Sequence, residues 1–313
     1  MAQTAWIGAH GHLPIGDLSL AVVDRAPSRL ALAHHQDPAG SVHSRMRVRS
    51  LGLHTELAMA GWRGVVHDRH DHLVVTHPKA PSFRGGNLLV FERPPEPGDL
   101  ERWCALFDGA IGTTPAYPYR ALAWDGLDGE EGQLEPFLAA GFERDLGVVL
   151  AAPRLLPPEH PRTDLRLEPL AGDAGWGAAV RLQAADAPPE RRSRYARLVS
   201  DVMRLNRRAV EAGHGVWWGA FDADALVGTL GVFRVDELAR FQAVVTHPDQ
   251  RNRGVASTLL HRAAEAALAA WGSELLVLEA DAEGAALGLY QRLGFTPLER
   301  RVGIMQDRPS PGA

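Results

Sequence analysis

A short turn rich in arginine and glycine is the feature of this sequence best suited to bind a ligand. It reads Arg251-Asn-Arg-Gly-Val-Ala-Ser257, after the apolar run Phe241–Val245 and before the helical pattern Thr258–Ala270. The first N–H groups of a helix have no partner within it, and the helix dipole adds partial positive charge there. Such a turn can hold a phosphate group, although an ordinary strand-to-helix turn would look similar.

The side chains of the turn favour the same ligand. Gly254 allows the backbone to approach a ligand closely, and Ala256 is too small to block that approach. Arg251 and Arg253 can add charge-assisted hydrogen bonds to phosphate oxygens. We therefore treat the turn as a candidate anion site that neighbouring elements must position.

Those neighbouring elements alternate between strands and helices. The patterns predict strands at 165–169, 239–246, 274–280 and 298–306, helices at 174–186, 189–212, 254–270 and 284–293, and a hairpin at 215–235. The hairpin turns at Asp222-Ala-Asp224, between two apolar runs. This order predicts an α/β (α+β) fold in which helices flank a mixed, mainly antiparallel sheet.

A second motif lies downstream of the turn, at Leu289-Tyr-Gln-Arg-Leu-Gly-Phe295. With Arg251–Ala256, it makes the chain resemble the GNAT superfamily of acetyl-CoA-dependent N-acetyltransferases. That family carries an Arg/Gln-x-x-Gly-x-Gly/Ala loop after its fourth strand and a later Leu-Tyr-x-x-x-Gly-Phe pattern. The resemblance covers roughly residues 164–306, about half of the chain.

The resemblance implies a site for acetyl-CoA, used as a co-substrate. The loop residues expected to hold its pyrophosphate are Arg251, Asn252, Arg253, Gly254, Val255, Ala256 and Ser257. In the family, strands four and five splay apart and the pantetheine arm pairs with strand four, which corresponds to Val244, Val245 and Thr246. A backbone N–H of this stretch is the expected oxyanion donor.

The resemblance also suggests the groups that move protons. Tyr290 occupies the general-acid position, where a phenol can protonate the departing thiolate, although a buried core tyrosine is the alternative. Glu279 is our first choice for the base, with Glu237 and Asp236 next, although a strand-end carboxylate is often only solvated. Glu283 stands where the family often has asparagine, so a side-chain contact to CoA is not expected there.

The sequence contains an internal repeat, whose two copies are offset by about 153 residues. The matching pairs are Asp71–Thr76 with Asp224–Thr229, Pro94 with Pro248, and Gly141-Phe142 with Gly294-Phe295. A proline-rich segment, Ala151–Arg162, separates the two copies. We therefore predict two tandem GNAT-like domains, at residues 1–158 and 159–313.

The first copy lacks the chemistry of the second. Where the second has its arginine-rich loop, the first has Pro95-Glu-Pro-Gly-Asp-Leu-Glu-Arg102, whose carboxylates would repel a pyrophosphate. Leu138 stands near the position that matches Tyr290. We predict that the N-terminal domain is degenerate and does not bind the cofactor.

Composition narrows the range of partners. The net charge is −5, which gives no general attraction to nucleic acid, and no apolar run is long enough to span a bilayer. A single cysteine, Cys104, excludes an internal disulfide and suits a reducing compartment. The N-terminal residues do not resemble a secretory signal, so we expect a cytoplasmic protein.

The resulting hypothesis is an N-acetyltransferase that transfers an acetyl group from acetyl-CoA to a primary amine by direct attack in a ternary complex. The expected acceptor is a small-molecule or peptide amine, and a homodimer is possible. One alternative is a non-catalytic acyl-CoA-binding or regulatory protein. Another is a small-molecule acetyltransferase similar to mycothiol synthase, which has the same two-domain layout.

Overall fold

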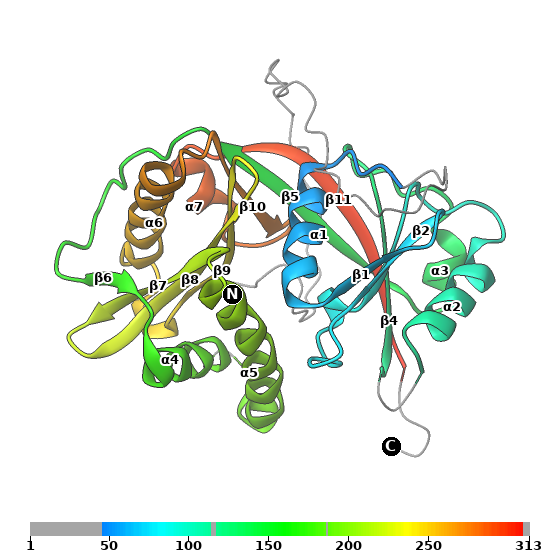
Figure 1. Ribbon diagram of the computed structural model, residues 1–313, viewed down its shortest axis with the longest axis horizontal. Helices are drawn as coiled ribbons and strands as arrows, with labels where there is room; N and C mark the ends of the chain where they lie inside the picture. The colour runs from blue at the N-terminus through cyan, green and yellow to red at the C-terminus, as the bar shows by residue number, and fades with distance from the viewer. Residues whose placement is uncertain (1–45, 114–116, 186, 309–313) are drawn as a thin grey trace.

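One continuous sheet of eleven strands runs through both halves of the chain (Figure 1). The computed structural model describes residues 46–113, 117–185 and 187–308. The strand order is β1-β2-β3-β4-β11-β5-β10-β9-β8-β7-β6. Within the described residues, neighbouring strands pair antiparallel except β3 with β4 and β9 with β10, as expected for a mixed, mainly antiparallel sheet.

The two halves repeat the same order of elements. The first half contains α1 (Leu51–Arg63), β1 (Val65–Asp68), β2 (His72–Thr76), β3 (Leu88–Phe91), α2 (Asp99–Ala110), β4 (Tyr119–Trp124), α3 (Glu135–Ala139) and β5 (Glu143–Ala152). The second contains β6 (Arg166–Pro169), α4 (Gly172–Ala184), α5 (Pro189–Glu211), β7 (Gly215–Asp222), β8 (Ala225–Val235), β9 (Leu238–Thr246), α6 (Val255–Trp271), β10 (Leu275–Asp281), α7 (Leu287–Arg292) and β11 (Thr296–Asp307). From α5 onward, the second half repeats the series that begins at α1.

The sequence repeat marks equivalent places in this series. Gly141 and Gly294 follow α3 and α7, and both have a positive φ, of 87° and 94°. Glycine adopts this backbone conformation without the strain that a Cβ atom would bring. The predicted internal repeat is therefore confirmed in the fold.

The last strand of each half lies beside the other half. β5 pairs antiparallel with β10, and β11 pairs antiparallel with both β4 and β5. The chain boundary that we predict near residue 158 falls in the connection between β5 and β6, which passes the outer side of α6 (Figure 1). In space, however, each half completes its sheet with a strand from the other, so neither half has an isolated sheet.

Helix α1 lies at the junction of the two halves (Figure 1). Its first turn is held by the carboxylate of Glu299 on β11, which accepts hydrogen bonds from the N–H groups of Leu51 (2.7 Å) and Gly52 (3.0 Å). Along its length α1 packs against α5 and β8. The first helix of the N-terminal half is thus fixed by elements of the C-terminal half.

One predicted helix is shorter than expected. The pattern predicted 284–293, but α7 begins at Leu287. The Asp281 carboxylate accepts a hydrogen bond from the Glu283 N–H (3.0 Å), and the Asp281 carbonyl accepts one from Gly284 (3.0 Å). These local bonds favour a turn after β10 and delay the helix.

Among the described residues, no helix is both long and apolar enough to span a membrane.

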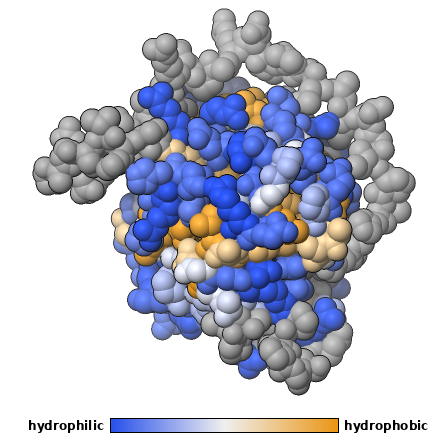
Figure 2. All heavy atoms as spheres, turned by 90° about the vertical axis from the view of Figure 1, so that its right-hand side faces the viewer, coloured by the Kyte–Doolittle hydropathy of each residue, from blue (hydrophilic) through white to orange (hydrophobic). Residues whose placement is uncertain are grey.

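The outer face of the N-terminal half is mostly hydrophilic and is crossed by a band of hydrophobic residues (Figure 2). Only three large apolar side chains of the described chain are strongly exposed: Val65, Leu156 and Leu298. The predicted homodimer stays a prediction.

Candidate active site

The parallel strands β9 and β10 separate along their length. Their pairing runs from Leu238 opposite Leu275 to Arg240 opposite Val277 and then ends. β9 continues alongside β8 as far as Thr246, whereas β10 continues alongside β5. The backbone of Val244, Val245 and Thr246 therefore borders a gap between the two strands.

A β-bulge in β9 lies at the edge of this gap. The register with β8 shifts between the pairs Thr229–Val245 and Gly231–Gln242, and Ala243 has a φ of 50°. A bulge disrupts the regular ladder locally and turns backbone groups away from it. The apolar run Phe241–Val245 gave no sign of the bulge, since alanine is a residue that rarely adopts positive φ.

The predicted phosphate loop follows β9 after a short 3-10 turn, Pro248–Gln250. It passes through Asn252 (φ 57°) to Gly254 (φ 78°), which is the N-cap of α6. The first turn of α6 has no acidic residue, and no side chain caps it. The hydroxyls of Ser257 and Thr258 instead donate back to the Gly254 carbonyl (3.0 and 2.7 Å).

This loop fits an anion. The N–H groups of Val255, Ala256 and Ser257 have no acceptor within the helix, because they belong to its first turn. Arg253 is exposed beside them. Gly254 also has a packing role, since a Cβ there would lie 2.3 Å from the His160 carbonyl oxygen in the β5–β6 connection.

Tyr290 lies on the face of the sheet covered by α6 and α7. Its ring contacts Phe295 edge-on (6.2 Å between centroids), and Phe295 in turn contacts Phe241 of β9 (6.3 Å). Burial raises the pKa of Tyr290 to about 12, so the phenol stays protonated at neutral pH. The residue can donate a proton, and it is also part of the hydrophobic core there.

Glu279 lies on the opposite face, beneath α1. Its carboxylate pairs with Arg240 (3.2 Å) and with Arg301, and only 3% of its side chain is exposed. Burial acts to raise the pKa of Glu279, but the charges of Arg301 and Arg240 outweigh it and hold the pKa below its usual value. A carboxylate bound by two guanidinium groups is a poor proton acceptor, which argues against the role of base.

The other two candidate bases lie far from the bulge. Asp236 and Glu237 form the turn between β8 and β9, at the closed end of the strand pair. Ala243 lies seven residues after Asp236, roughly 20 Å along an extended strand. Asp236 instead contacts His54 of α1 (2.9 Å).

Sequence reasoning missed a carboxylate that the fold brings to this region. Glu56 of α1 accepts a hydrogen bond from the Gln242 side chain (3.1 Å), directly before the bulge. It also pairs with Arg63 (3.1 Å), which donates to Asn206 of α5 (3.1 Å). No sequence signal could have linked Glu56 to β9, because the two are 186 residues apart.

The equivalent place in the N-terminal half is closed. β3 and β4 stay paired to their last residues, Phe91 opposite Trp124, and the Asp125 N–H then donates to the Phe91 carbonyl (2.9 Å). At the start of α2, the buried Asp99 carboxylate accepts from the Glu96 N–H (2.9 Å) and pairs with Arg93 (2.7 Å). A carboxylate of the chain itself therefore lies in the first turn of α2, where its charge disfavours an anion.

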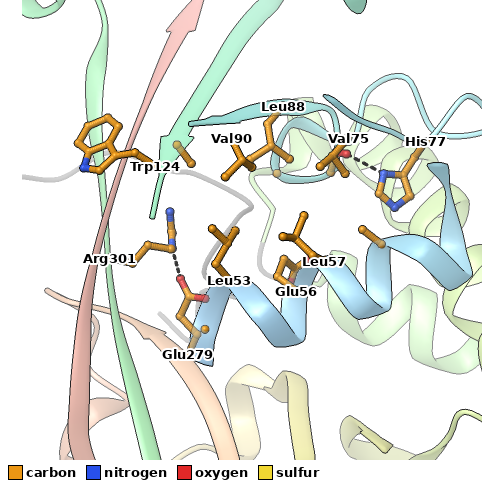
Figure 3. Close-up of a pocket in the computed structure, with 15 residues that line it drawn as sticks. Leu53, Glu56, Leu57, Val75, His77, Leu88, Val90, Trp124, Glu279 and Arg301 are labelled. Carbon is orange, nitrogen blue, oxygen red and sulfur yellow. Dashed lines mark hydrogen bonds and ion pairs between the residues drawn. The ribbon is translucent and has the colours of Figure 1, made fainter. Parts of the chain in front are cut away.

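A pocket lies beneath α1, between this helix and strands β2, β3 and β4 (Figure 3). It is narrow and open to solvent at its mouth. His77 lies at one end, and Glu279 with Arg301 lies at the other (Figure 3).

Comparisons with known proteins relate one segment of the chain to a family. Residues 213–297 match the family model described as an acetyltransferase (GNAT) domain. A comparison with curated protein sequences returned no match. The matched segment holds β7 to β10, the predicted phosphate loop and Tyr290.

Solved structures share the fold over most of the chain. A functionally unknown conserved protein from Staphylococcus epidermidis ATCC 12228 is similar with a TM-score of 0.63 at 14% identity, over 79% of this chain and 95% of that one. A GCN5-related N-acetyltransferase from Kribbella flavida has a TM-score of 0.55 at 18% identity, over 84% and 98%. One from Sphaerobacter thermophilus has a TM-score of 0.51 at 18% identity, over 82% and 87%. Residues 213–297 therefore match a GNAT acetyltransferase domain, and the chain shares its fold with solved GNAT structures.

Proposed function

We propose that the C-terminal half is an N-acetyltransferase that transfers the acetyl group of acetyl-CoA to a primary amine by direct attack in a ternary complex. The observation that carries this proposal is the gap between β9 and β10, which opens toward the uncapped first turn of α6. Acetyl-CoA supplies an acetyl group activated as a thioester.

Each group of residues has a role in this proposal. The loop Arg251–Ser257 binds the pyrophosphate through the first N–H groups of α6 and the exposed Arg253. The backbone of Val244–Thr246 holds the pantetheine arm, and an N–H at the bulge stabilises developing charge on the acyl oxygen. Tyr290, protonated at neutral pH, donates a proton to the leaving sulfur.

The N-terminal half, in this proposal, has no cofactor site. The continuous pairing of β3 with β4 and the position of Asp99 at the start of α2 support this assignment. Its role is to complete the shared sheet and to place α1 over β9 and β10. A cytoplasmic location is also proposed, on the basis of the single cysteine.

Titration calorimetry with acetyl-CoA tests the proposal directly. We expect one site per chain, with affinity reduced at least tenfold by Arg253→Glu, because a carboxylate would then face the phosphates. The matched control is Arg102→Glu, near the start of α2, which should leave binding unchanged. Two sites would contradict a degenerate N-terminal half, and no binding at millimolar acetyl-CoA would refute the acetyltransferase proposal.

A second function is favoured by one observation. Two arginines hold Glu279, the residue first expected to act as the base, so its carboxylate is a poor proton acceptor. A protein that binds acyl-CoA without catalysis would not need a free base at this position. Binding of acetyl-CoA without acetylation of any primary amine would support this regulatory alternative.

A further inference from the structure

The pocket beneath α1 joins the N-terminal half to the site at β9 and β10. Its walls are apolar and come from α1 and the strands of the N-terminal sheet, chiefly Leu53, Leu57, Val75, Leu88 and Val90 (Figure 3). It is also lined by Glu56 and Glu279, which contact β9 through Gln242 and Arg240. Gln242 adjoins the bulge and Arg240 is the last residue of β9 paired with β10, so the two carboxylates of the pocket contact side chains next to the point where the strands separate.

His77 gives the opposite end of the pocket a specific hydrogen-bonding property. Its Nδ1 lies 2.7 Å from the Gly86 carbonyl, which can only accept, so Nδ1 carries the hydrogen. Burial, together with the charge of Arg63, lowers the pKa of His77 to about 4, and the ring is neutral at pH 7. Its buried Nε2 is then an acceptor, and it has no hydrogen-bond partner among the described residues.

Of the two carboxylates that line the pocket, Glu56 is the less constrained, because it pairs with one arginine, Arg63, and Glu279 pairs with two. The side chain of Glu56 is 15% exposed, against 3% for Glu279. Glu56 and Tyr290 lie on opposite faces of the sheet, because Glu56 contacts β9 from α1 whereas Tyr290 packs with α7. A substrate at Glu56 would thus approach the bulge from the face opposite the proton donor.

We propose that this pocket is the acceptor site, and that it takes a small primary amine with a short apolar body. The ammonium group lies at Glu56, the apolar body lies beneath α1, and a hydroxyl or amide N–H at the far end donates to His77 Nε2. This inference rests on the function proposed above and assigns its substrate class.

The proton balance of the step follows from these positions. Glu56 accepts one proton from the ammonium group, and the amine nitrogen then bonds to the acyl carbon as the carbon–sulfur bond breaks. The sulfur leaves with the bonding electron pair and takes a proton from Tyr290. The second proton of the nitrogen passes through solvent to restore the phenol of Tyr290, and Glu56 releases its proton to solvent. The net products are an amide, a thiol and one released proton.

The test uses acetyl-CoA with two amines of equal length, 4-amino-1-butanol and pentylamine, and measures thiol release. We expect acetylation of both, with kcat/KM at least tenfold higher for 4-amino-1-butanol because only its hydroxyl can donate to His77. Glu56→Gln should reduce kcat at least a hundredfold, with acetyl-CoA affinity unchanged. The matched control is Glu135→Gln, an exposed carboxylate of α3, which should change nothing.

A second measurement does not depend on activity or on a variant. Titration of the wild-type protein with 4-amino-1-butanol should shift the methyl NMR signals of Leu53, Leu57 and Val75, and not those of α6. Unshifted pocket methyls, or full activity in Glu56→Gln, would overturn the acceptor site. If acetyl-CoA binds but neither amine is acetylated, the acceptor class is wrong while the cofactor site stands; if acetyl-CoA does not bind, the proposed function itself fails.

Discussion

The two halves contain the same pair of parallel strands, and the pairs differ in where they separate. β9 and β10 part at Arg240 and Val277, and β9 continues past that point through a bulge to Thr246. β3 and β4 stay paired to Phe91 and Trp124 and close with a further hydrogen bond. A gap for a ligand therefore depends on strand length and a bulge, which vary while the fold stays the same.

The helices that follow these strands also differ, because the first turn of α6 suits an anion better than the first turn of α2. Both α6 and α2 begin at a glycine with positive φ, Gly254 at 78° and Gly98 at 89°. The first turn of α2 contains Asp99 and Glu101, whereas that of α6 contains no acid. The backbone geometry for anion binding thus exists twice, and side-chain charge decides which copy can use it.

Removal of the charge of Glu279 should have the largest effect on stability. Glu279→Gln would leave Arg240 and Arg301 buried without their shared partner, which should lower the free energy of unfolding by about 3–5 kcal/mol. The control is Glu168→Gln in the exposed Arg166–Glu168 pair, for which a change within about 0.5 kcal/mol is expected. Urea denaturation measures both, and equal effects would contradict a structural role for Glu279.

The two helix-capping glycines should respond differently to alanine. Gly254→Ala places a Cβ 2.3 Å from the His160 carbonyl oxygen in addition to the strained φ, so we expect a loss of about 2–4 kcal/mol and loss of acetyl-CoA binding. Gly98→Ala meets no atom within 4 Å and should cost only about 1 kcal/mol. Equal losses for the two variants would show that the β5–β6 connection does not constrain Gly254.

His77 should make the stability of the protein depend on pH. The repeat places Leu230, which cannot titrate, at the equivalent position of the other half. The pKa of His77 is lowered from 6.5 to about 4, so between these values the unfolded chain binds a proton that the folded chain does not. Stability should therefore fall as the pH drops from about 6.5 to 4, by about 3 kcal/mol. His77→Gln should lose that part of the pH dependence, and an unchanged profile in urea titrations would contradict a neutral buried imidazole.

Tyr290 should matter for turnover alone. Tyr290→Phe retains the ring contact with Phe295 and removes the phenol, so we expect turnover to fall about a hundredfold, equivalent to roughly 2.7 kcal/mol, with acetyl-CoA affinity unchanged. Phe137→Leu, which alters the aromatic core of the other half, serves as a control and should affect stability rather than kcat. Wild-type turnover in Tyr290→Phe would leave the residue with a core role only.

Much of the local structure could be predicted from the sequence. The periods of apolar residues placed the strands and helices of the second half within a few residues, from the strand at 165–169 to the strand at 298–306. The error at α7 arose from Asp281, whose local hydrogen bonds favour a turn over the first turn of a helix. The loop after β9 was also recognisable, because glycine, arginine and the start of a helix are local features.

The site as a whole could not be predicted in this way. Glu279 has the same sequence pattern whether it is solvated or buried between two arginines, and only the packing of β9, β10 and β11 determines which. The bulge at Ala243 has no residue that marks it. Glu56 meets Gln242 only because α1 lies over the junction of the halves.

By itself, the sequence determined the order of the elements, the repeat, the anion-binding turn and the family resemblance, because these depend on residues close together along the chain. The tertiary structure decided the exchange of β5 and β11, the separation of β9 from β10 and the pocket beneath α1. These features depend on hydrogen bonds and burial between residues far apart in sequence. Their stability is a property of the whole packed sheet, so no single segment encodes them.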